Sequence, residues 1–190
     1  MDDEIEYKGH TIKVEQDDLI EDPLEYCTEI GITYLRSSRY ILGNVPVNDP
    51  QEWRTEKLRE LAKKRPGVKK ADLMFEYPVY AYIHSGVVLA MSPFSCQWDS
   101  GQSGVIYMSR ADAAQWFQRK FKDPELESLV KPMLKSTLET FNQFISGEVY
   151  YYRIEDSDGE EVDGCGGFYG SDHEKSGLLT AARETIDSLQ

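Results

Sequence analysis

The chain has 190 residues, of which 40% are hydrophobic, with 12 Tyr, 7 Phe and 3 Trp. This composition supplies a sizeable core and excludes wholesale disorder. The formal charge of −13 at pH 7 is concentrated at the ends, because residues 1–29 hold eleven acids against two bases and residues 151–190 hold ten against three. Such a surface repels phosphate backbones and argues against direct nucleic-acid binding.

The N-terminal part is predicted to be an acidic segment over residues 1–23, partly flexible, with a short strand at 10–14. A single domain is expected over residues 24–190. Extended structure at 31–42 ends in a turn at Gly43-Asn44. Asp49 as N-cap and Pro50 at the first helical position then predict a helix that ends near Lys64.

Three strands are predicted in the middle of the chain, at 77–83, 87–91 and 104–108. The first two are joined by His84-Ser85-Gly86, which is short enough for an antiparallel hairpin. A longer loop over 92–103 precedes the third. These strands predict an antiparallel sheet.

Helices dominate the following segment. Ser109 with Asp112 predicts a capped helix through Phe117, and apolar residues at spacings of three and four predict a second helix over 123–146, kinked or broken at Pro132. A fourth strand of the sheet is expected at 148–154, followed by a hairpin turn at 158–159. Ser171 is expected to cap a C-terminal helix.

These elements together predict an α+β fold, with an antiparallel sheet of about four to six strands packed against three to four helices. No continuous apolar run reaches the roughly 18 to 20 residues of a membrane helix, and the acidic N-terminus lacks the features of a signal peptide. A cytoplasmic location is therefore expected. Cys27, Cys96 and Cys165 are widely spaced and odd in number, which favours reduced thiols.

Several segments together resemble a family of uncharacterised bacteriophage and mobile-element proteins. They are 38–43, His84-Ser85-Gly86, the stretch 92–104 that contains Pro-Phe-Ser-Cys-Gln-Trp-Asp-Ser-Gly-Gln, 147–150 and 163–170. The resemblance spans roughly residues 24–170. Gly166 departs from it, because the family pattern has Trp between Cys165 and Gly167. The resemblance implies a phage-like context in the host bacterial cytoplasm and no particular chemistry.

One set of residues could support nucleophilic catalysis, with Cys96 as nucleophile, His84 as base and Asp99 as orienter. The competing interpretation is a rigid structural loop, because Phe94, Cys96 and Trp98 alternate like core-facing side chains. The rigid loop is preferred, and a small cysteine-dependent enzyme is the alternative.

No metal site or cofactor is expected. The acids at 156–163 lack the ligand spacing of a calcium loop, and the three cysteines with His84 lack the spacing of a zinc site. A basic stripe is interpreted as a solvated helix face, with contact to the acidic ends of a second copy as the weaker alternative. It comprises Lys57, Arg59, Lys63, Lys64, Arg65, Lys69 and Lys70.

The acidic ends lead to the most specific functional hypothesis, because carboxylates on a rigid surface can imitate the phosphates of a duplex. We therefore expect a DNA-mimic inhibitor that binds a basic nuclease or defence complex of the host, of the anti-restriction or anti-CRISPR kind. A homo-oligomeric structural protein, such as a homodimer, is a further alternative. The expected contact residues are Asp2, Asp3, Glu4, Asp17, Asp18, Glu21, Asp22, Glu25, Asp156, Asp158, Glu160 and Glu161.

Overall fold

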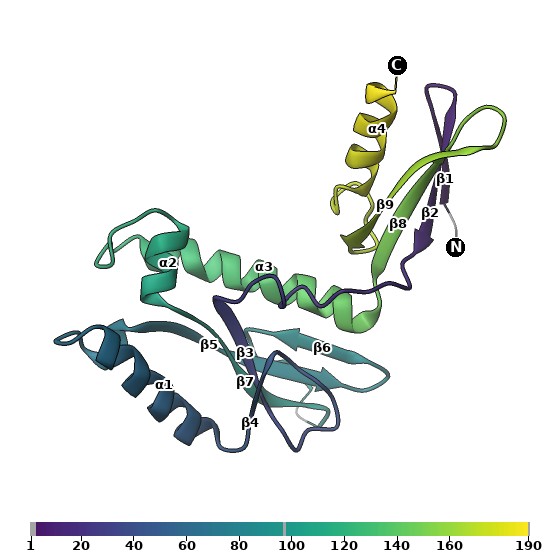
Figure 1. The fold of residues 1–190 in the computed structure, drawn as a ribbon. Helices are drawn as coiled ribbons and strands as arrows, with labels where there is room; N and C mark the ends of the chain where they lie inside the picture. Colours follow the sequence, from purple (N-terminus) through teal and green to yellow (C-terminus); the bar gives the residue numbers. More distant parts are fainter. Residues whose placement is uncertain (1–2, 97, 190) are drawn as a thin grey trace. The chain divides into compact units, whose positions relative to one another are not determined.

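A computed structural model describes residues 3–96 and 98–189 (Figure 1). The chain forms two compact units. We call Met1–Asp22 together with Gln143–Gln190 the terminal unit, and Pro23–Asn142 the central unit. The expected division into an acidic segment 1–23 and a single domain 24–190 differs from this arrangement, because the N-terminal strands pair with strands from the C-terminal part of the chain.

The terminal unit contains a four-stranded antiparallel sheet with one helix. The strand order is β1 (Asp3–Tyr7), β2 (His10–Gln16), β8 (Val149–Glu155) and β9 (Glu161–Tyr169). Helix α4 (Leu178–Ser188) packs on one face of this sheet (Figure 1). The opposite face, which we call the uncovered face, lies away from α4.

Buried apolar and partly exposed polar residues alternate along β2, so the terminal sheet has one apolar face and one polar face. Ile12 and Val14 are fully buried, whereas Thr11, Lys13 and Glu15 between and beside them point to the opposite face. The buried residues join a core formed with β8 and α4, in which each fully buried aliphatic side chain contributes about 1.5 to 3 kcal/mol. Its members are Ile12, Val14, Tyr152, Ile154, Leu178, Leu179, Ala182 and Ile186.

The central unit contains a five-stranded sheet in the order β4 (Val45–Val47), β3 (Ile30–Leu35), β7 (Ser100–Ser109), β5 (Met74–Ile83) and β6 (Val87–Ala90). All pairs are antiparallel except β3 with β4. Its helical elements are α1 (Pro50–Lys64), the 3₁₀ turn η1 (Lys70–Asp72), α2 (Arg110–Trp116) and α3 (Leu126–Ser146), whose last four residues belong to the terminal unit. Leu58 and Leu61 of α1 pack against Leu73, Met74 and Tyr107.

The α+β fold class is confirmed. The predicted strand at 148–154 forms, but as β8 it pairs with β2 and β9 in the terminal sheet, so the strands divide between two sheets. The hairpin turn is also confirmed, since the Asp156 N–H donates to the Glu160 carbonyl at 3.0 Å and Gly159 adopts a φ of 80°.

Two of the three predicted helix caps are confirmed. Asp49 Oδ1 accepts from the N–H groups of Gln51 and Glu52 at 2.7 and 3.0 Å, and Ser109 Oγ accepts from the Asp112 N–H at 3.1 Å. The sequence predicted a kink or a break at Pro132. Helix α3 continues through this residue without interruption (Figure 1), so the helix is not broken there. Packing of its apolar face, in which Val130, Leu134 and further leucines are buried, stabilises the helix on both sides of the proline.

The third predicted cap, at Ser171, is wrong. Helix α4 begins at Leu178, and the residues before it form turns in which the Ser176 N–H donates to the Asp172 carbonyl at 2.9 Å. Gly177 has a φ of 83°, a left-handed conformation that no right-handed helix can continue through. The helix therefore starts after this glycine.

Candidate partner-binding surface

The two units differ sharply in charge. The terminal unit contains 20 acidic residues and 5 basic residues, a net charge of −15, whereas the central unit contains 14 acidic and 16 basic residues, a net charge of +2. Pairing of β2 with β8 brings the two acidic ends of the chain into the same sheet. The charge excess of the whole chain is thus carried by its smaller unit.

On the uncovered face of the terminal sheet, two cations are paired with acids of the same face. Lys13 Nζ lies 2.8 Å from Glu155 and 3.8 Å from Glu4, and a guanidinium nitrogen of Arg153 lies 2.8 Å from Glu15. The hydrogen bond to Glu155 raises the pKa of Lys13. Both cations are therefore occupied by carboxylates of the unit itself.

Glu15 is held by a hydrogen bond and an ion pair on this face. Its Oε2 accepts a hydrogen bond of 2.6 Å from the Tyr151 hydroxyl, and this bond, aided by Arg153, lowers the pKa of the Glu15 carboxyl. The same bond raises the pKa of Tyr151. Glu15 consequently stays ionised to lower pH than an ordinary glutamate.

The turn between β8 and β9 projects four of the expected contact residues. Asp156 Oδ1 accepts from the N–H groups of Asp158 and Glu160 at 2.9 and 3.0 Å, which fixes the turn. Asp158, Glu160 and Glu161 are exposed. These four acids, called the acidic tip, therefore project from an ordered hairpin.

A second group of expected residues, Asp17, Asp18, Glu21 and Asp22, follows β2. Asp17 accepts from the Leu19 N–H at 2.9 Å and, through Oδ2, from the Gly167 N–H of β9 at 3.0 Å. The Tyr169 hydroxyl donates to the Glu21 carbonyl at 2.8 Å. These bonds hold the segment after β2 against β9.

The two groups lie at opposite ends of the strands. Thr11 pairs with Glu155 near the acidic tip, and Gln16 pairs with Tyr150 near Asp17. The seven residues of β8 separate them by about 20 Å at a rise of about 3.3 Å per residue. Glu4, Glu6, Glu15 and Glu155 lie on the uncovered face between them, together with the cations Lys13 and Arg153. Acids therefore outnumber cations along an elongated band, and we call these acids the acidic strip.

Three expected residues lie outside the acidic strip. Asp3 is on the α4 side of the sheet, where its Oδ2 lies 3.7 Å from His173 Nε2. Glu25 belongs to the central unit, and Asp2 lies outside the described residues. Glu6, Glu15 and Glu155 were missed by the sequence analysis, although the alternation of apolar residues in 10–16 was a signal that places Glu15 on the face away from the core.

Gly166, which departs from the phage family pattern, lies against this strip. A Cβ at this position would meet Asp17 Oδ2 at 2.5 Å and the Cβ of Tyr151 at 3.3 Å. Asp17 and Tyr151 therefore occupy the space beside the glycine, and no side chain fits there without displacing the Asp17 carboxylate.

Cys96, His84 and Asp99 are brought together in the central unit. Asp99 Oδ2 lies 3.6 Å from His84 Nδ1 and 3.7 Å from Cys96 Sγ. The carboxylate thus stands between the thiol and the imidazole, whereas nucleophile activation requires the imidazole next to the thiol. Trp98, expected to face the core, is 96% exposed, because the loop that carries it lies at the surface.

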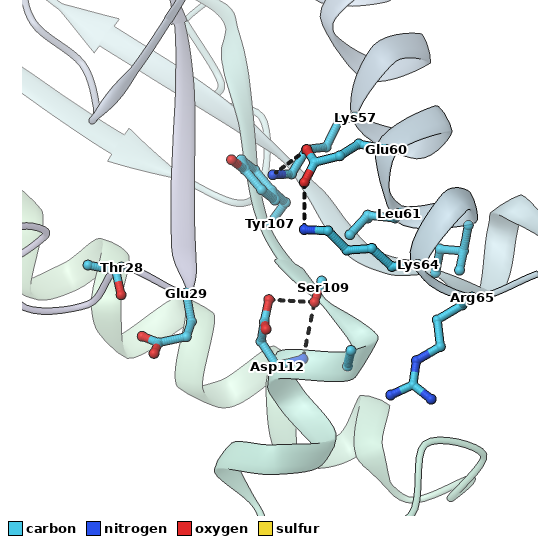
Figure 2. Close-up of a pocket in the computed structure, with 12 residues that line it drawn as sticks. Thr28, Glu29, Lys57, Glu60, Leu61, Lys64, Arg65, Tyr107, Ser109 and Asp112 are labelled. Atoms are coloured by element: carbon cyan, nitrogen blue, oxygen red, sulfur yellow. Dashed lines mark hydrogen bonds and ion pairs between the residues drawn. The ribbon is translucent and has the colours of Figure 1, made fainter.

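The basic stripe is partly neutralised within α1. Figure 2 shows a pocket in which Glu60 pairs with Lys57 and Lys64. The pocket has a volume of about 160 Å³, and Glu60 lies 3.5 Å from Lys57 Nζ and 2.8 Å from Lys64 Nζ. Lys57 also lies 5.9 Å from the centre of the Tyr107 ring. Three acids and three bases line this pocket, and Glu60 pairs with two of the bases.

No group of three or more His, Cys, Asp or Glu side chains in the described part of the chain could hold a metal ion. Cys27 and Cys96 belong to the central unit and Cys165 to the terminal unit, and all three are free thiols. Among residues 3–96 and 98–189, no helix combines the length and apolar character needed to cross a membrane.

No family model, curated protein sequence or solved structure matches this chain.

Proposed function

We propose that the chain is an accessory protein of a phage or mobile element that uses its acidic strip to occupy the nucleic-acid groove of a basic host defence protein. The observation that supports this most is the pairing of β2 with β8, which collects a net charge of −15 in one small sheet unit. The proposed partner is a nuclease component of the restriction or CRISPR type.

The arrangement of the acidic strip favours a groove rather than a point contact. Its acids extend along the strands for about 20 Å, and the hydrogen bonds of Glu15, Asp17 and Asp156 hold their carboxylates on an ordered framework. A rigid row of negative charges loses little conformational entropy on binding and accelerates association with a basic surface. Both properties suit a competitor of a nucleic-acid duplex.

The experiment is a capture from bacterial lysate with the tagged full chain, followed by competition. We expect bound proteins to be retained at about 50 mM salt, released at about 200 mM salt and displaced by added duplex DNA, because the contact is electrostatic. The test variant neutralises the acidic tip and should lower the affinity about tenfold or more. It carries Asp156→Asn, Asp158→Asn, Glu160→Gln and Glu161→Gln.

A matched control removes the same number of charges from the central unit. It carries Glu52→Gln, Glu56→Gln, Glu125→Gln and Glu139→Gln, and we expect it to bind like the unmodified chain. Equal losses in both variants, or capture that neither salt nor DNA displaces, would refute the proposal.

A further inference from the structure

A second cavity in the central unit has a different character from the pocket of Figure 2. It has a volume of about 380 Å³ and lies between the loop that follows α1 and the segment that follows α2. Its lining includes Gly67, Lys69, Asp72, Arg110, Phe121 and Lys122. None of these residues belongs to the terminal unit, so the cavity is independent of the acidic strip.

Arg110 is held in place by the fold and is left with an unused donor. Its backbone N–H donates to the Leu73 carbonyl at 2.9 Å, and its guanidinium lies 4.4 Å from the centre of the Phe75 ring. The Nε atom is buried and has no hydrogen-bond partner among the described residues. Because Nε is shielded from solvent, the guanidinium can meet a ligand in the cavity only through its terminal nitrogens.

The cavity also has an excess of positive charge. Lys69 and Lys122 are exposed, and neither forms an ion pair with a carboxylate in the described part of the chain. Asp72 is the single acid among the lining residues. Three cations thus face one carboxylate.

Neighbouring acids are already engaged elsewhere. Asp112 is bound by the hydroxyl of Ser109 at the start of α2, and Asp123 and Glu125 each lie 3.8 Å from Arg119. These contacts leave Asp72 as the one acid beside the cavity's three cations, whereas Lys57 and Lys64 in the pocket of Figure 2 are both paired with Glu60.

An apolar wall accompanies the cations. Phe121 lines the cavity, and the guanidinium of Arg65 lies 5.1 Å from the centre of its ring. A bare inorganic anion would use only the cations, whereas an ester with an apolar or planar group would also contact this wall. The volume lies within the roughly 300 to 1,000 Å³ of small-molecule sites.

We propose that this cavity binds a phosphate monoester of the size of a mononucleotide. The phosphate lies against Arg110, whose planar guanidinium suits phosphate oxygens, and Lys69 and Lys122 balance its charge. The organic group lies along Phe121. A free nucleotide and the 5′-phosphorylated end of a strand share this chemistry, so both are candidate sources of the phosphate.

The test is isothermal titration of the full chain with three probes: AMP, inorganic phosphate and adenosine. We expect AMP to bind, phosphate to bind more weakly and adenosine to give no heat. Replacing both exposed lysines, as Lys69→Ala with Lys122→Ala, should raise the Kd for AMP about tenfold or more, because two charged contacts are lost. A 5′-phosphorylated oligonucleotide as a fourth probe distinguishes a strand end from a free nucleotide.

The control variant is Lys131→Ala with Lys135→Ala on α3, which causes the same change in charge within the central unit. We expect it to bind AMP like the unmodified chain. Absence of AMP binding, equal binding of AMP and adenosine, or equal weakening by both lysine pairs would overturn the proposal. None of these results depends on the capture experiment, because the acidic strip is unchanged in both variants.

Discussion

The terminal and central units differ in how completely their cations are paired with carboxylates. In the terminal unit each of the five basic residues is bound to a carboxylate of the same unit, at 2.5 to 2.8 Å. In the central unit, Lys69, Arg110 and Lys122 line a cavity whose single acid is Asp72. The excess of acids in the terminal unit and the cations of this cavity are therefore among the charges that other molecules can bind.

The net charge of each unit, rather than that of the whole chain, indicates which partners the protein can bind. A value of −13 for the chain conceals a unit of −15 and a unit of +2. Because surface charges more than about 8 to 10 Å apart are screened at physiological salt, a partner responds to the local unit. Partners of opposite charge can thus be proposed for one protein.

The largest expected effect is that a substitution in the core of one unit destabilises that unit and leaves the other folded. Ile154 is fully buried in the terminal core, and Ile154→Ala should destabilise that unit by about 2 to 5 kcal/mol. Hydrogen exchange should then show lost protection in β2 and β8 while β5 and β7 stay protected. The matched variant Ile106→Ala, at a fully buried position of β7, should give the reverse pattern. Uniform loss in both variants would show that the two units unfold together.

A moderate effect on the free energy of unfolding is expected at the helix starts, because α1 of the central unit has a side-chain cap and α4 of the terminal unit has none. Asp49→Ala removes the side chain that accepts two N–H groups of α1 and should cost about 1 kcal/mol. Ser171→Ala should change the free energy of unfolding by less than about 0.5 kcal/mol, because α4 begins after Gly177 without a side-chain cap. Denaturant unfolding of both variants measures the difference, and a larger cost at Ser171 would contradict the assigned start of α4.

The smallest expected effect is a change in the pKa of Glu15 in the acidic strip. Tyr151→Phe removes the hydrogen bond to Glu15 and should raise the pKa of Glu15 toward the usual value of a glutamate. Since a lowered pKa stabilises the folded state at neutral pH and this contribution disappears as the pH falls through it, the variant should lose less stability on acidification. An NMR titration of the Glu15 carboxyl measures the shift. Tyr150→Phe is the control, and an equal shift there would contradict the assigned bond.

The sequence predicted features that depend on near neighbours. Asp49 and Ser109 were recognisable as caps because their partners lie two or three residues away, and the turn at Gly159 because glycine permits a positive φ. The prediction at Ser171 failed because Gly177 interrupts the helical conformation after a suitable capping pattern. The break at Pro132 failed because packing of the apolar face of α3 outweighs one lost hydrogen bond.

What the sequence determined by itself was the α+β class, the helix starts at Asp49 and Ser109, and the acidity of both ends. Only the tertiary structure decided that these ends share one sheet, with Lys13 and Arg153 neutralised inside it. It also decided that Arg110, Lys69 and Lys122 line one cavity. The physical reason is that β2 and β8 pair across more than 130 residues of chain, and such distant pairings follow from packing that no local pattern of residues encodes.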